Sequence, residues 1–243
     1  ASKLKTKIMA NFSLEMSAAI STGWEYAKKY GLLIAVIYLL LGLVTRALSS
    51  MVGPSFNMAD SQAIGEAISK GDWSSLGNLS QSYNSVGANI GNMFGGIIST
   101  IVSVGLYNLA LGLMSGRYNE VTFDAFKLPF ATYLKAFVVS FIVGIIGIVA
   151  LFCCVIPFFF VAPSLILAPV YQVENPEAGI IESISAAWKM TSDNTMSMLG
   201  LGIVMVGVDI VGFLCCCIGV YFAEAIQLFV MIAAYNQLKG NLE

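Results

Sequence analysis

The chain has 243 residues, of which 58% are apolar and 11% are charged, and its formal net charge is −2. Because soluble domains are about 45–50% apolar and about 25% charged, this composition excludes a soluble globular protein, and it also excludes a disordered one. The slight negative charge argues against binding to nucleic acid, which needs a basic face.

Long tracts with few or no charged residues predict an all-α integral membrane protein with six transmembrane helices. A helix needs about 20 apolar residues to cross about 30 Å of hydrocarbon, and its backbone groups are then satisfied within the segment. The tracts 136–173 and 194–238 are each too long for one crossing, so we expect reversals at Pro157 and near Gly219. The predicted spans cover residues 30–48, 88–113, 133–152, 157–173, 196–215 and 220–238.

The six spans form three hairpins, each of which follows an amphipathic stretch that we expect to lie as a helix in the cytoplasmic interface. These stretches cover residues 14–30, 121–128 and 176–190, and we expect the last helix to begin with Asn175 as N-cap and Pro176 as its first residue.

We interpret the single membrane domain, residues 1–243, as three copies of this unit, because Cys153-Cys154 and Cys215-Cys216 occupy equivalent places. The second repeat unit covers residues 121–173 and the third covers 176–239. In the first unit, a polar extracytoplasmic loop at residues 49–85 interrupts the hairpin. Within it we predict a short helix with Asp60 as N-cap that ends near Lys70.

The basic residues predict the orientation, because lysine and arginine collect on the cytoplasmic side of membrane proteins. Of the 12 basic residues, ten lie on one side of the six spans and two on the other, which places both termini in the cytoplasm. The ten are Lys3, Lys5, Lys7, Lys28, Lys29, Arg117, Lys127, Lys135, Lys189 and Lys239, and the two are Arg46 and Lys70.

Three short patterns resemble a known family. They are Ile20-Ser21-Thr22-Gly23-Trp24 before the first span, Pro157 with Pro163 and Ala168-Pro169 in the fourth, and Glu182-Ser183-Ile184-Ser185-Ala186-Ala187-Trp188 before the fifth. The family is an uncharacterised bacterial one of polytopic membrane proteins, related to the membrane domain of glycerophosphodiester phosphodiesterases. The resemblance covers most of the chain except residues 49–85. It implies a multi-pass protein of the bacterial cytoplasmic (inner) membrane and brings no catalytic residues, since the phosphodiesterase domain is not part of this sequence.

Two carboxyl groups fall inside the predicted spans. Asp209 lies eight residues before Cys217 and Glu224 lies seven after it, so helical rise places both about 10–12 Å from the outer surface. A carboxylate at the centre of a span costs about 3 kcal/mol and often marks a route for ions or protons. Other interpretations remain open: hydrogen bonds of a protonated acid to Asn108, Gln227 or a serine, an ion pair with Arg46, or contact with a partner.

Five cysteines cluster at the predicted outer ends of two hairpins. A disulfide between the clusters is one interpretation, because such bonds persist outside the cytoplasm. Packing as small apolar side chains is another, and a thiolate metal site is a third, although adjacent cysteines on a helix point in different directions. We therefore assign no metal ligands. The five are Cys153, Cys154, Cys215, Cys216 and Cys217.

Small residues recur every four positions along the second predicted span and form one smooth stripe where another helix can approach closely. The stripe predicts packing within the chain, a homo-oligomer seam or a pore lining. Its members are Gly87, Gly91, Gly95, Ser99 and Ser103.

No catalytic residues or cofactor are expected. Histidine is absent, which removes the commonest general base, and no phosphate-binding or dinucleotide-binding motif occurs. We expect a non-catalytic integral membrane component that binds or stabilises a membrane protein complex or lipid. The alternative is a small transporter or channel that uses intramembrane carboxylates for proton or cation passage. The expected partners are the lipid bilayer and either a membrane protein or a second copy of the chain, with no nucleic acid.

Overall fold

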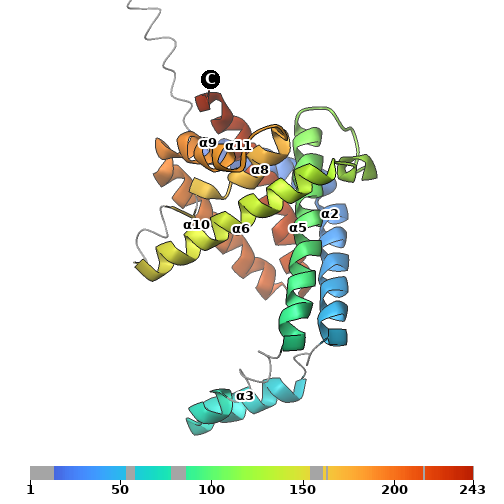
Figure 1. Cartoon of the computed structure of the whole chain (residues 1–243), viewed down its shortest axis with the longest axis vertical. Coiled ribbons are helices and arrows are strands. Elements are labelled where there is room, and N and C mark those ends of the chain that lie inside the picture. Colours follow the sequence, from blue (N-terminus) through green and yellow to red (C-terminus); the bar gives the residue numbers. More distant parts are fainter. Residues whose placement is uncertain are drawn as a thin grey trace, which may run out of the picture. The chain divides into compact units, whose positions relative to one another are not determined.

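The computed structural model describes residues 14–52, 58–77, 86–153, 161–162, 164–215 and 217–242 (Figure 1). These residues are almost entirely helical and include no strand, which confirms the all-α prediction. The helices in chain order are α2 (Met16–Val52), α3 (Met58–Lys70), α5 (Val86–Met114), η1 (Phe123–Phe126), α6 (Phe130–Cys153), α8 (Ala168–Glu174), α9 (Ile180–Ser192), α10 (Thr195–Leu214), α11 (Cys217–Leu238) and η2 (Lys239–Leu242).

Among the described residues, five helical segments are long and apolar enough to cross a membrane, which characterises a multi-pass membrane protein. They are Met16–Leu48, Met93–Met114, Phe130–Ala150, Thr195–Leu214 and Gly219–Leu238. The chain divides into two compact units, one of Ala1–Tyr38 with Val102–Glu243 and one of Leu39–Ile101.

The larger unit is built around α11. In α11, 56% of the most apolar window is buried, compared with 17% in α10, which packs along it. The chain reverses between Leu214 and Cys217, a few residues earlier than the predicted turn near Gly219. The reversal is tight because Gly212 of α10 and Gly219 of α11 face each other, backbone against backbone.

The N-terminal helix differs from its prediction. The sequence predicts an interfacial helix over residues 14–30 that is separate from the first span, whereas α2 runs through both without a break. Proline is absent from this segment, and its Gly23 and Gly31 allow close packing. A Cβ on Gly23 would lie 2.7 Å from the Cα of Val230 in α11. Side chains from the C-terminal half of the chain cap α2, since the Leu14 N–H donates to Asn194 and the Glu15 N–H donates to Gln237.

The second predicted interfacial helix, over residues 121–128, is wrong, because this stretch contains only the single 3₁₀ turn η1. Aromatic rings here lie flat on glycines of α5. A Cβ on Gly105 would come within 2.1 Å of the Phe126 ring, and one on Gly112 would come equally close to the Tyr118 ring. These contacts fix the connection from α5 to α6 against the helix and leave no room for a free amphipathic helix.

The predicted fourth span, residues 157–173, is not one continuous helix in its described part. Helical residues at 161–162 and 164–165 are followed by a turn at 166–167, after which α8 begins. Pro169 stands at the start of α8, where its missing N–H costs no hydrogen bond, so the sequence itself breaks the span there. Residues 154–160, with the predicted reversal at Pro157, and residue 163 lie outside the described residues, among which five candidate membrane helices are found.

The stretch predicted as the third interfacial helix is helical as α9, but the helix starts four residues later than expected. Asn175 ends α8 instead of capping α9, and Pro176 lies in the turn. Gly179 is the N-cap, and its backbone N–H donates to the Glu182 carboxylate at 3.0 Å. Glu182, at the third helical position, thus caps the first turn of α9. This cap, rather than Pro176, determines where the helix begins.

The smaller unit, Leu39–Ile101, contains α3 and the adjoining parts of α2 and α5. The predicted helix in the loop 49–85 is present as α3, with Asp60 inside it rather than at its cap. α3 ends at Lys70, as predicted, and Gly71 adopts a positive φ of 65°. Asp72 then accepts hydrogen bonds from Ser74 and Ser75, which hold the pKa of its carboxyl down at about 2.

Candidate functional site

The α10–α11 hairpin brings together three of the predicted intramembrane polar residues. The Gln227 amide donates hydrogen bonds to the Asp209 carboxyl and, at 3.3 Å, to the backbone carbonyl of Met205. Glu224 lies three residues before Gln227, so both side chains leave the same face of α11. The Glu224 carboxyl interacts electrostatically with Asp209. Hydrogen bonding to Gln227 was one of the open interpretations of Asp209.

Both carboxyls lie near the turn of the hairpin. Asp209 precedes Leu214, the last residue of α10, by five positions, which is about 7.5 Å of helical rise. Glu224 follows Cys217, the first residue of α11, by seven positions, or about 10.5 Å. The carboxyls are therefore at similar depth within their helices, slightly closer to the turn than the sequence indicated.

Two tyrosines that the sequence reasoning missed extend this group. The Tyr38 hydroxyl of α2 interacts electrostatically with Glu224 and with Tyr107 of α5. Isolated tyrosines in apolar spans resemble ordinary core residues, so no sequence pattern marked them. We name Asp209, Glu224, Gln227, Tyr38 and Tyr107 the intramembrane polar cluster, and four helices of the larger unit contribute to it.

Asp209 lies at the edge of the cluster and is exposed. Its neighbours on α10 are apolar and also exposed: Val206 at 57% and Phe213 at 77%, each about one turn away, and the adjacent Ile210 at 56%. We name these four residues the α10 face. An exposed carboxyl among exposed apolar side chains, in a helix of membrane-spanning length, is the most unusual feature of the described structure.

The remaining two predicted polar residues are not part of the cluster. Asn108 is buried, and it donates to the Ala125 carbonyl at 2.8 Å and accepts from Arg117 at 3.3 Å, so it holds the α5–α6 connection. The interpretation of Asn108 as a partner of the acids is therefore wrong. Arg46 is exposed and belongs to the smaller unit, and its ion pair with an acid stays a prediction.

The cysteine prediction is tested at one position. Cys215 is a free, exposed thiol at the end of α10, which speaks against the disulfide interpretation at this residue. Cys153 ends α6 and Cys217 begins α11, while Cys154 and Cys216 lie outside the described residues. Within the described ranges, no group of three or more potential metal ligands occurs.

The predicted stripe of small residues lies along α5. At Gly95, a Cβ would meet the Thr45 side chain of α2 at 3.6 Å, within the smaller unit. This contact favours packing within the chain, the first of the three interpretations. Gly87, Gly91, Ser99 and Ser103 also lie in α5, and the two serines are half-buried.

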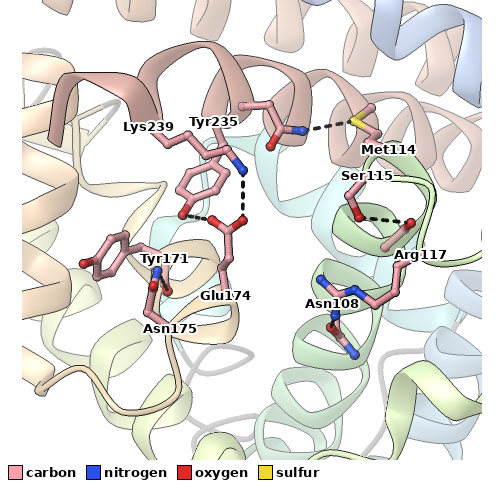
Figure 2. A network of polar contacts seen from close by, with 11 residues as sticks. Asn108, Met114, Ser115, Arg117, Tyr171, Glu174, Asn175, Tyr235 and Lys239 are labelled. Atoms are coloured by element: carbon pink, nitrogen blue, oxygen red, sulfur yellow. Dashed lines mark hydrogen bonds and ion pairs between the residues drawn. The ribbon is translucent and has the colours of Figure 1, made fainter. Parts of the chain in front are cut away.

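A second polar network joins α8 to the end of α11, at the opposite end of α11 from the hairpin turn (Figure 2). Glu174 accepts hydrogen bonds from the Tyr235 hydroxyl and from Lys239 at 2.9 Å. The neighbouring Gln172 is fully buried; its amide donates to the carbonyls of Asn175 and Ala178, and its oxygen accepts from Ser183. Apart from the Gln172–Asn175 bond, which lies within the end of α8, these bonds tie one helix or turn to another, which indicates a structural role.

Comparison with protein-family models, with curated proteins and with solved structures finds no match to this chain. The candidate site is therefore defined by its geometry alone.

Proposed function

We propose that the protein is a non-catalytic membrane component that binds a partner membrane protein through the α10 face. The observation that carries the proposal is the exposed Asp209 carboxyl within a helix of membrane-spanning length. Ionisable side chains inside membrane segments almost always face the interior of a bundle or pair with another group. A carboxyl that this chain leaves exposed is thus expected to be covered by a second chain.

The chemistry of Asp209 indicates what the partner carries. Among the described residues, its only hydrogen bond uses one oxygen, through the Gln227 amide. A carboxyl offers two oxygens with about four acceptor positions, so a donor from outside still has room to bind. We propose that the partner is a transmembrane helix with an amide, hydroxyl or basic side chain at this depth, whose apolar residues pack against Val206, Ile210 and Phe213.

The test uses a photo-crosslinking amino acid at Val206, with Val211 as the matched control. Both are valines of α10, exposed by 57% and 59%, but they lie on different sides of the helix. We expect a single protein adduct from Val206 in native membranes, no protein adduct from Val211, and roughly tenfold less Val206 adduct in Asp209→Leu, because one membrane hydrogen bond contributes about 1–2 kcal/mol. An adduct with a second copy of this chain would identify the partner as a homo-oligomer. Adducts with lipid alone at both positions would contradict the proposal.

The proposal includes the finer topology. We propose six crossings with both termini in the cytoplasm, the sixth made by the interrupted segment that ends in α8. The ten-to-two distribution of basic residues supports this orientation. A bacterial cytoplasmic membrane and membership of the family that the chain resembles are supported by the patterns around Trp24, Pro169 and Trp188.

A second candidate function, passage of protons or cations, is favoured by one specific observation. In the intramembrane polar cluster, the exposed Asp209 interacts electrostatically with the half-buried Glu224, and Glu224 interacts in the same way with Tyr38. Carboxyls and hydroxyls in such a series mark proton relays in many membrane proteins. If the protein has this function, the purified protein in liposomes must conduct ions. Partner binding requires no such flux, so the measurement separates the two functions.

A further inference from the structure

A groove with a volume of about 320 Å³ lies between α6 and the described residues 161–162 and 165–166, within the larger unit. Its lining is entirely apolar in residue type, and the residues are Val143, Gly144, Gly147, Ile148, Val161, Ala162, Leu165 and Ile166. The groove shares no residue with the α10 face or with the intramembrane polar cluster.

Two glycines create the hollow in α6. Gly144 and Gly147 lie three residues apart and share one face of the helix, so the wall of the groove recedes there. A Cβ added to Gly144 would meet no atom within 4 Å. Elsewhere in the larger unit, glycines such as Gly23 and Gly212 allow close helix contact. At Gly144 the space is open, and no side chain or backbone of the described residues fills it.

The surroundings of the groove determine what can occupy it. Only 11% of the most apolar window of α6 is buried, the lowest fraction among the five candidate membrane helices. Ile148 belongs both to the groove and to the exposed apolar surface that includes Phe141 and Ile145. The groove is therefore continuous with the surface that α6 presents to hydrocarbon. Water would find no polar partners in it, because an ordered water needs two to four of them.

We propose that this groove binds one acyl chain of a membrane phospholipid. The lining residues of α6 lie 13–18 positions after Phe130, which is about 20–27 Å along the helix. The groove is therefore away from the start of α6, at a depth that an acyl chain can reach. The apolar lining recognises the chain and makes no contact that selects a headgroup. The binding is independent of the proposed partner on α10, so either proposal can fail alone.

The decisive variant is Gly144→Leu, which fills the groove from inside without meeting other atoms at its Cβ. Its matched control is Gly207→Leu on α10, where a Cβ also meets nothing within 4 Å but which does not line this groove. The protein is purified in mild detergent with added phosphatidylethanolamine or phosphatidylglycerol, and bound lipid is counted by native mass spectrometry. We expect one retained phospholipid in the parent and in Gly207→Leu, and roughly tenfold weaker retention in Gly144→Leu, equivalent to about 1.4 kcal/mol.

A second measurement needs no variant. A phosphatidylcholine with a diazirine at the end of one acyl chain, reconstituted with the parent protein, is expected to label peptides that contain residues 143–148 and 161–166. Equal lipid retention in Gly144→Leu and Gly207→Leu, or labelling spread evenly over α6 and α10, would overturn the proposal. Strong preference for one headgroup, or a protein occupying the groove in crosslinking, would also overturn it. Failure of the α10 crosslinks leaves these readouts unaffected.

Discussion

Replacement of Gly212 by leucine is expected to destabilise the α10–α11 hairpin by about 3 kcal/mol, near the upper end of what overpacking costs. A Cβ at this position would lie 2.8 Å from the backbone carbonyl oxygen of Gly219 and 2.9 Å from the Cβ of Ala223. Backbone atoms cannot rotate away as a flexible side chain does, so the two helices must separate. Separation would also break the Gln227–Asp209 hydrogen bond, because it joins the same two helices.

The measurement is unfolding of the purified variant by sodium dodecyl sulfate in mixed micelles, followed by circular dichroism. Gly207→Leu is the control, since it adds the same side chain to an exposed position of the same helix. We expect Gly207→Leu to unfold within about 0.5 kcal/mol of the parent, as surface substitutions usually do. Equal stability of the two variants would contradict the close approach of α10 and α11.

The second large effect is expected from Gln172→Leu, at about 3 kcal/mol. Gln172 is fully buried, and its amide and oxygen bond the Asn175 and Ala178 carbonyls and the Ser183 hydroxyl. Leucine has a similar size but removes all three hydrogen bonds, each of which contributes about 0.5–1.5 kcal/mol to stability. The ends of α8 and α9 are expected to loosen together, because the network joins them.

A double-mutant cycle with Ser183→Ala separates this network from simple packing. The two residues are hydrogen-bonded at 2.9 Å, so we expect a coupling of about 1 kcal/mol between the substitutions. Gln62→Leu, at an exposed position of α3, controls for the change of residue type. Additive effects of Gln172→Leu and Ser183→Ala would show that the network contributes nothing beyond the separate side chains.

The features predicted correctly depend on local physical rules. Long tracts with few or no charged residues identify the apolar helices. A tract as long as 194–238 exceeds one membrane crossing and has to reverse, so the α10–α11 hairpin follows from the sequence alone. Asp209 and Glu224 interact electrostatically because they lie at similar distances from that turn. The short helix of the loop 49–85 ends at Lys70 because Gly71 supplies a positive φ.

The features that sequence reasoning missed depend on tertiary contacts. Residues 121–128 have an amphipathic pattern, yet they form only a 3₁₀ turn, because the rings of Tyr118 and Phe126 pack onto glycines of α5. Asn175 resembles an N-cap, but Glu182 closes the helix from Gly179 instead. Asn108 appears intramembrane from its position in the span, although its partners are in the connection beyond the helix.

The intramembrane polar cluster was predicted only in part, because some of its members are brought together by tertiary contacts. A carboxyl in an apolar span is visible in the sequence, and so are candidate amide partners such as Gln227. The choice between Gln227 and Asn108 required the register of α10 against α11. Tyr38 and Tyr107 lie in helices distant in the sequence from α11, and only the packed structure shows that Tyr38 interacts electrostatically with both Glu224 and Tyr107.

The measurement that tests the account most directly is the sidedness of the two chain ends. The account requires that the interrupted segment ending in α8 crosses the membrane with the five continuous helices, which makes six crossings. Tags before Ala1, after Glu243 and after Gly71 are probed in intact cells and again after permeabilisation. We predict that only the tag after Gly71 is accessible in intact cells. Accessibility of exactly one terminal tag would mean an odd number of crossings and would contradict the account.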